Sequence, residues 1–166
     1  MRARYSGSSA RLAPCPQGTS AAVLDVRRLG KQRVEAVQVL RGLVVPGYGW
    51  RRHPAVRMWA GYEEALVRYR LEICGVWTDE GRADTCAVTL TQDFEASRAG
   101  GAPRTQEQLA ADGDLPPWLG VPDFHRSHQS ALVCKDPACY RERFPGVPDD
   151  LPYVWPRSDR DTDGVP

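Results

Sequence analysis

Two groups of side chains in the first third of the chain have residue types that bind nucleic acid. The first group places four cations within seven residues, and cations at this density attract phosphate oxygens. Its members are Arg27, Arg28, Lys31 and Arg33, with Asp25 and Glu35 beside them. The alternative interpretation is a solvated helix face whose charges pair along the helix.

The second group interleaves aromatic and guanidinium side chains at the expected start of a helix. Nucleobases stack on exposed aromatic rings, and arginine adds charge and cation–π contacts. In the alternative interpretation the segment is a turn whose tryptophan belongs to the core. The group comprises Trp50, Arg51, Arg52, His53 and Arg57. From both groups we predict DNA contacts by Arg27, Arg28, Arg33, Arg51, Arg52 and Arg57.

His125 and His128 stand about one helical turn apart and therefore share one side of a helix. Such a pair can bind phosphate or metal, or act as acid and base near neutral pH. The alternative is a structural role, with each ring bonded to a backbone group. Cys134 and Cys139 follow at a spacing that fits no standard zinc signature. We therefore expect no metal and no other cofactor.

Composition is typical of one globular domain. The chain has 166 residues, of which 42% are hydrophobic and 26% charged. No segment is apolar enough to span a membrane, and the five cysteines form no CxxC pair, so we expect a cytoplasmic protein with reduced thiols. The net charge is only +1, yet residues 1–72 hold 13 basic and 5 acidic residues, whereas residues 73–166 hold 9 and 16. This asymmetry favours a basic binding face.

The spacing of apolar residues predicts the elements that position these groups. Residues 20–44 show helical spacing and predict an amphipathic helix, either continuous or broken near Gly30. Apolar residues three and four apart predict a long helix from Pro54 to Trp77, and Gly81 is placed to end it.

The second half of the chain predicts shorter helices and long loops. Residues 84–120 are expected to form a long loop with at most one short helix, at 105–111. A helix is expected over 123–134 and a short helical turn over 136–143. No strand is indicated, so the predicted fold is all-α: a compact single-domain helical bundle with long loops and a proline-rich C-terminal tail. The expected boundaries are 1–18 for an irregular N-terminal arm, 19–156 for the helical domain and 157–166 for a disordered tail.

Five segments, taken in order, resemble a group of uncharacterised bacterial proteins related to the pyrimidine dimer DNA glycosylase family, whose best-known member is phage endonuclease V. The resemblance covers roughly residues 22–156. The segments are LDVRRLGKQRVEAVQVLRGL, GWRRHPAVRMWAGYEEALVRY, GRADT, HRSHQSALVCKDPACYRERFP and DDLPYVWP.

The resemblance implies a compact all-α protein that binds duplex DNA, flips a base beside a cyclobutane dimer, cleaves its glycosidic bond and nicks the abasic site by β-elimination. It also implies an N-terminal α-amine as nucleophile, assisted by a glutamate in the first helix. Here Arg2 disfavours removal of Met1, and Arg28 occupies the position that corresponds most closely to the family's glutamate. Because a lysine amine can form the same Schiff base, we predict Lys31 as nucleophile and Glu35 as base.

The sequence thus predicts a monomeric DNA-repair enzyme, with base excision or AP lyase chemistry on damaged duplex DNA and an altered active site. One alternative is a nucleic-acid-binding module without catalysis. Another is an enzyme on a small molecule or nucleotide that uses His53, His125 and His128, with or without a metal. Glu64 and Asp84 are weaker candidates for a general base. The DNA-binding prediction assumes that the early guanidinium groups converge on one patch.

Overall fold

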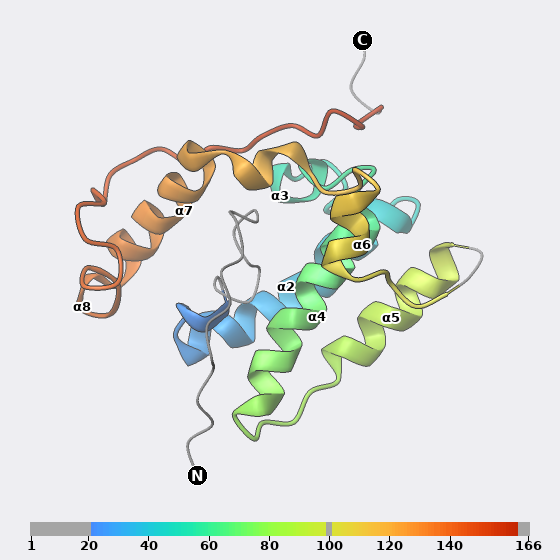
Figure 1. Cartoon of the computed structure of the whole chain (residues 1–166), viewed down its shortest axis with the longest axis horizontal. Helices are drawn as coiled ribbons and strands as arrows, with labels where there is room; N and C mark the ends of the chain where they lie inside the picture. Colours follow the sequence, from blue (N-terminus) through green and yellow to red (C-terminus); the bar gives the residue numbers. More distant parts are fainter. Residues whose placement is uncertain (1–20, 99–100, 163–166) are drawn as a thin grey trace.

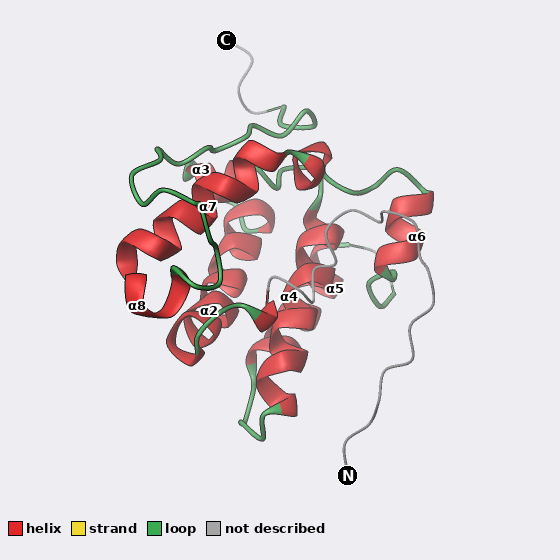
Figure 2. Cartoon of the chain, turned by 60° about the vertical axis from the view of Figure 1, so that its left-hand side comes forward, coloured by secondary structure: helices red, strands yellow, loops and turns green. Residues whose placement is uncertain are grey.

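The computed structural model describes residues 21–98 and 101–162, and over these residues it contains helices and no strand (Figure 1, Figure 2). The predicted all-α class is therefore confirmed. The elements are α2 (Val26–Val44), α3 (Pro54–Arg57), α4 (Glu63–Asp79), α5 (Cys86–Ser97), α6 (Gln106–Ala111), a 3-10 helix (Pro117–Gly120), α7 (Pro122–Lys135) and α8 (Pro137–Tyr140). None of these helices combines the length and apolar character needed to cross a bilayer.

Three helices, α2, α4 and α5, pack against one another and form the centre of the core (Figure 1). The apolar spacing of α2 buries Leu29, Val39 and Leu40 on one face, as the sequence predicts. The helix begins at Asp25, whose side chain accepts a hydrogen bond from the Arg28 amide at 3.0 Å. It continues through Gly30 without a break. Of the two alternatives predicted from the sequence, the continuous helix is therefore the one observed.

The prediction of one long helix from Pro54 to Trp77 is wrong, because two helices, α3 and α4, form instead. Gly61 stands between them with φ +77°, in the left-handed region that favours glycine. Arg160 from the far end of the chain passes over this turn, and its guanidinium lies 4.2 Å from the centre of the Tyr62 ring. A distant side chain therefore helps to fix the break.

We expect Gly61→Ala to destabilise the fold by at least about 2 kcal/mol, because left-handed backbone is unfavourable for alanine by about 1–2 kcal/mol and a clash adds to this. A Cβ at Gly61 would lie 2.5 Å from Cβ of Arg160. Gly47→Ala is the matched control, since Gly47 has φ +76° and nothing within 4 Å of such a Cβ. Urea denaturation measures both losses, and equal losses would contradict the role given to Arg160.

The loop expected over 84–120 contains more helix than predicted. The short helix at 105–111 is confirmed as α6, which begins with a capping box formed by Thr105 and Gln108. The helix α5, however, was not predicted. Its sequence CAVTLTQDFEAS contains threonine and valine, which have modest helix propensity. Burial of Leu90 and Phe94 on one face of α5, next to α2 and α4, overrides that preference.

The helices α7 and α8 lie outside the central group (Figure 1). Both were expected from the sequence, at nearly the same residues. The Trp118 ring lies between Trp59 and Phe124, with ring centroids 4.7 and 4.8 Å away, and its Nε1 donates to the Met58 carbonyl at 2.9 Å. This connection attaches the start of α7 to the end of α3.

The C-terminal segment runs along α7 as an extended chain. Backbone amides of Leu151 and Val154 donate to the hydroxyls of Ser130 and Ser127 on α7, at 3.0 and 3.1 Å. Residues 157–162 also pack on the body, since Ser158 is 4% exposed and donates to the Ala60 carbonyl. This packing differs from the disordered tail expected over 157–166. Residues 163–166 and the predicted arm at 1–18 lie outside the described residues.

Candidate nucleic-acid interface

The first cationic group is largely engaged with carboxylates. The Arg28 guanidinium pairs with Asp25 at 2.5 Å and with Asp136 at 3.4 Å, and it lies over the Tyr140 ring at 5.1 Å. Burial raises the pKa of Asp25, but hydrogen bonds from Tyr140 and Arg28 outweigh burial and leave the pKa well below its ordinary value. Arg28 therefore joins the start of α2 to α8.

Arg33 contacts a different part of the fold from Arg28. Its guanidinium pairs with Asp84, just before α5, and lies 4.0 Å from the centre of the Trp77 ring. Both partners are buried, with side-chain exposures of 11% for Arg33 and 3% for Asp84. Asp84, considered above as a base, is thus one half of a buried ion pair. Arg28 and Arg33 contact different elements, so they do not form the common patch that the DNA-binding prediction assumes.

The remaining predicted DNA-binding arginines differ in environment. Arg57 pairs with Asp161 at 2.8 Å, which attaches α3 to the C-terminal segment. Arg51 and Arg52 are exposed in the turn before α3, and Arg27 is exposed near the start of α2. In the described part of the chain, neither Arg27 nor Arg52 forms an ion pair. Exposed cations thus lie near both ends of α2.

Lys31 and Glu35 lie together on the exposed side of α2. The Lys31 amine is 3.4 Å from Oε1 of Glu35, and the two side chains are 71% and 33% exposed. An amine and a carboxylate are therefore adjacent and open to solvent. This pair has the two functional groups that Schiff-base formation and proton abstraction require.

Each predicted histidine has a backbone partner. His53 caps α3, with Nδ1 accepting from the Ala55 amide at 3.1 Å. His125 Nε2 lies 2.6 Å from the Leu119 carbonyl, and His128 Nδ1 lies 3.0 Å from the Phe124 carbonyl, so both rings donate. These contacts agree with the structural alternative for the pair on α7. Burial lowers the pKa of His128, which favours its neutral form near neutral pH.

One group of metal-ligand types comes together among the described residues, and it is not the histidine and cysteine set considered above. Ligand atoms of Asp25, Asp136 and Cys139 lie within 4.8 Å of one another. Both carboxylates already pair with Arg28. The group is accounted for by the contact between α2 and α8.

His53 belongs to a continuous row of rings that the fold assembles from three segments. We call Trp50, His53, His128, Tyr153 and Trp155 the aromatic strip. Trp50 stacks on His53 with ring centroids 5.2 Å apart, and His53 meets Trp155 edge-on at 6.3 Å. Trp155 stacks on Tyr153 at 5.3 Å, and His128 contacts both of these rings edge-on at 5.3 and 5.2 Å.

The aromatic strip remains open to solvent. Trp50, Tyr153 and Trp155 are 39%, 42% and 40% exposed, which is high for rings of this size. Lys135 lies at the Tyr153 end, where its amine is 3.0 Å from Oη and 5.6 Å from the ring centre. Trp50, His53 and His128 were predicted from the sequence as site residues, whereas Tyr153 and Trp155 were not. Their alternation in an extended, proline-flanked segment places both rings on one side and was the available signal.

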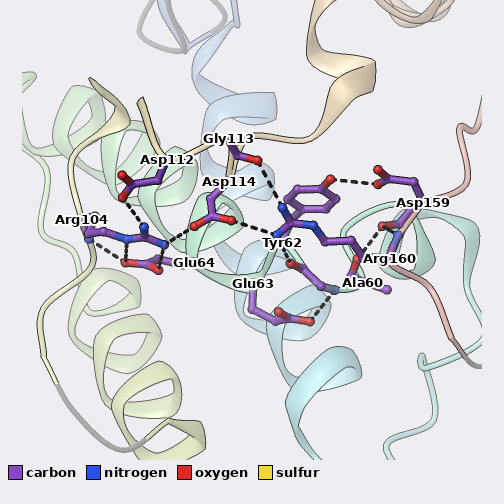
Figure 3. A network of polar contacts seen from close by, with 12 residues as sticks. Ala60, Tyr62, Glu63, Glu64, Arg104, Asp112, Gly113, Asp114, Asp159 and Arg160 are labelled. Atoms are coloured by element: carbon purple, nitrogen blue, oxygen red, sulfur yellow. Dashed lines mark hydrogen bonds and ion pairs between the residues drawn. The ribbon is translucent and has the colours of Figure 1, made fainter. Parts of the chain in front are cut away.

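Glu64, the other carboxylate considered as a base, is the centre of a polar network (Figure 3). It accepts from the amide and the guanidinium of Arg104 at 2.9 and 2.7 Å, and from Arg98 at 2.8 Å. Arg104 also binds Asp114, which in turn binds Arg160 at 3.0 Å. Hydrogen bonds from Arg104 outweigh burial and lower the pKa of Glu64 to about 2. The carboxylate is therefore structural.

Comparison with known proteins relates one part of the chain to a known family. Residues 11–90 match the family model described as pyrimidine dimer DNA glycosylase. Searches of curated proteins and of solved structures found no match. Residues 11–90 are thus similar to a DNA-repair family, in agreement with the resemblance seen in the motifs. The matched span includes α2, α3 and α4, and hence Lys31, Glu35, Trp50 and His53.

Proposed function

We propose that this protein is a DNA-repair enzyme that binds damaged duplex DNA and cleaves it at abasic sites by lyase chemistry after base excision. The observation that carries the proposal is the exposed Lys31 amine, 3.4 Å from the Glu35 carboxylate, within the segment related to the pyrimidine dimer DNA glycosylases. The amine is the nucleophile and the carboxylate is the base.

The reaction proceeds through a covalent intermediate. The Lys31 amine attacks C1′ of the ring-opened abasic sugar, and loss of water gives a protonated Schiff base. Glu35 then removes a proton from C2′, and the electron pair of that C–H bond expels the 3′ phosphate, which breaks the strand. Water adds to the imine, releases the unsaturated aldehyde and restores the amine. No metal takes part in these steps.

Exposed arginines provide the charge for binding the duplex. Arg27 and Arg52 are exposed and form no ion pair among the described residues, whereas Arg28, Arg33 and Arg57 bind carboxylates of their own chain. Each phosphate neutralised by such a cation releases counterions, so the affinity for DNA falls as salt rises. We assign DNA contacts to the exposed group and a structural role to the paired group.

Borohydride trapping on abasic duplex DNA tests the nucleophile directly, because Lys31 and Lys135 are the only two lysines in the chain. Reduction converts the Schiff base into a stable amine that migrates as a protein–DNA adduct. We expect Lys31→Ala to lower the yield of adduct at least about tenfold, since the remaining groups lack a positioned amine.

Lys135→Ala is the matched control, since it removes the same functional group from α7, and at saturating concentrations of abasic duplex it should trap like the parent protein. Full trapping by Lys31→Ala would show that Lys31 is not the nucleophile. Persistence of that adduct in the variant that lacks both lysines would assign it to the α-amine. DNA binding without any adduct in the parent protein would favour the non-catalytic module.

A further inference from the structure

We propose that the aromatic strip binds single-stranded DNA, with unpaired bases stacking on its exposed rings. The identity of the ligand as DNA rests on the proposed function, but the surface itself is a separate feature. Three of its rings, His128, Tyr153 and Trp155, lie beyond the segment related to the glycosylase family. The strip therefore adds a binding surface that the matched segment does not contain by itself.

A structural role alone does not explain how many rings the aromatic strip contains or how exposed they are. A tryptophan that only anchors a tail is expected to be almost completely buried, as Trp59 and Trp118 are at 5% and 4% exposure. Trp50 and Trp155 instead remain 39% and 40% exposed at successive points of the strip, and Tyr153 continues it at 42%. Exposed rings in series are the feature with which proteins bind unpaired bases, because every base has a face that can stack.

Hydrogen bonds to the backbone hold the strip in place before any ligand binds. His53 is fixed by its bond from the Ala55 amide, and Val154, between the two C-terminal rings, donates to Ser127. His128 in turn is tied to the Phe124 carbonyl. Because the rings are already ordered, binding loses little side-chain entropy.

Charge selects a polyanion over a neutral partner. Exposed aromatic rows also bind proline-rich peptides, which carry no backbone charge. Here Lys135 lies at the Tyr153 end of the strip, and the exposed Arg52 is adjacent to His53 in the sequence. Cations beside stacked rings match alternating phosphates and bases, so the ligand is single-stranded DNA and not a peptide.

Fluorescence anisotropy with a labelled oligothymidylate of about twelve nucleotides tests the proposal, since sites of this kind span about 4–16 nucleotides. We expect Trp155→Ala to weaken binding about tenfold and Trp155→Phe, which keeps a ring, to weaken it less than about threefold. Val88→Ala removes a 59% exposed apolar side chain from α5 and should leave affinity unchanged. Thermal melting shows that each variant is folded, and Tyr153→Ala repeats the test if Trp155→Ala is not.

Unchanged affinity in folded Trp155→Ala would overturn the proposal, as would tighter binding of a proline-rich peptide than of the oligonucleotide. The outcome is separable from that of the lyase proposal. Lys31→Ala should still bind the oligonucleotide, and Trp155→Ala should still form the borohydride adduct at saturating concentrations of abasic duplex. If the adduct never forms while Trp155 governs oligonucleotide affinity, the lyase proposal alone fails.

Discussion

Glu64→Gln is expected to lower the free energy of unfolding by about 3 kcal/mol at pH 7. The pKa of this carboxyl is about 2 in the folded protein, against an ordinary value of 4.5, and each pKa unit corresponds to about 1.36 kcal/mol. The side chain is only 10% exposed, so solvent screens the interaction little. Glutamine keeps the shape but loses the charge that binds Arg104 and Arg98. Urea denaturation at pH 7 measures the loss.

The pH dependence follows from the direction of the shift. Because folding lowers the pKa of Glu64, its contribution is complete above pH 4.5 and is lost as the pH falls toward 2. The difference in stability between the parent protein and Glu64→Gln should therefore shrink over that interval. Glu95→Gln removes an equal charge from an exposed position on α5 and should give a small difference at all pH values. A difference for Glu64→Gln that does not change between pH 7 and pH 2.5 would contradict the assignment.

The helices that the sequence predicted correctly are those with a strong local signal. Apolar spacing and a capping aspartate define α2, and Thr105 with Gln108 marks the start of α6. The break at Gly61 had no such signal, because Arg160, which covers that turn, lies 99 residues away in the sequence. Local patterns thus predicted the elements, whereas the turn that separates α3 from α4 depends on a long-range contact.

The candidate site divides in the same way. Trp50 and His53 are close in the sequence and were predicted together, and Lys31 and Glu35 are one helical turn apart. The contact of His53 with Trp155 joins residues 102 positions apart and had no local signal. The assembly of the aromatic strip from distant segments could therefore be seen only in the structure.

Density of charge in the sequence was a poor guide to density of charge in space. On a helix of 3.6 residues per turn, five residues correspond to a rotation of about 140°. Arg28 and Arg33 are five residues apart and consequently point to different neighbours, Asp136 on one side and Asp84 on the other. A helical projection of the first cationic group would have separated them, although it would not have identified their carboxylate partners.

Asp84→Ala is expected to destabilise the protein by about 3–5 kcal/mol, because removal of one partner leaves the other charge buried and unpaired. The Arg33 guanidinium would remain between Trp77 and the start of α5 without a counter-charge. Burial raises the pKa of Asp84, but hydrogen bonds from the Ala87 and Cys86 amides and from Arg33 together keep it below its ordinary value. The alanine variant therefore also loses an acceptor at the beginning of α5.

A double-mutant cycle separates this structural role from DNA binding. Because Arg33→Met and Asp84→Asn each break the same ion pair, their combined loss of stability should be smaller than the sum of the single losses by at least about 1 kcal/mol. Folded Arg33→Met should bind duplex DNA like the parent protein, whereas Arg52→Ala, at an exposed position, should weaken binding and reduce its salt dependence. If Arg33→Met instead lowers DNA affinity as strongly as Arg52→Ala without loss of stability, then Arg33 leaves Asp84 to contact DNA, and the basic face of α2 is larger than its ion pairs indicate.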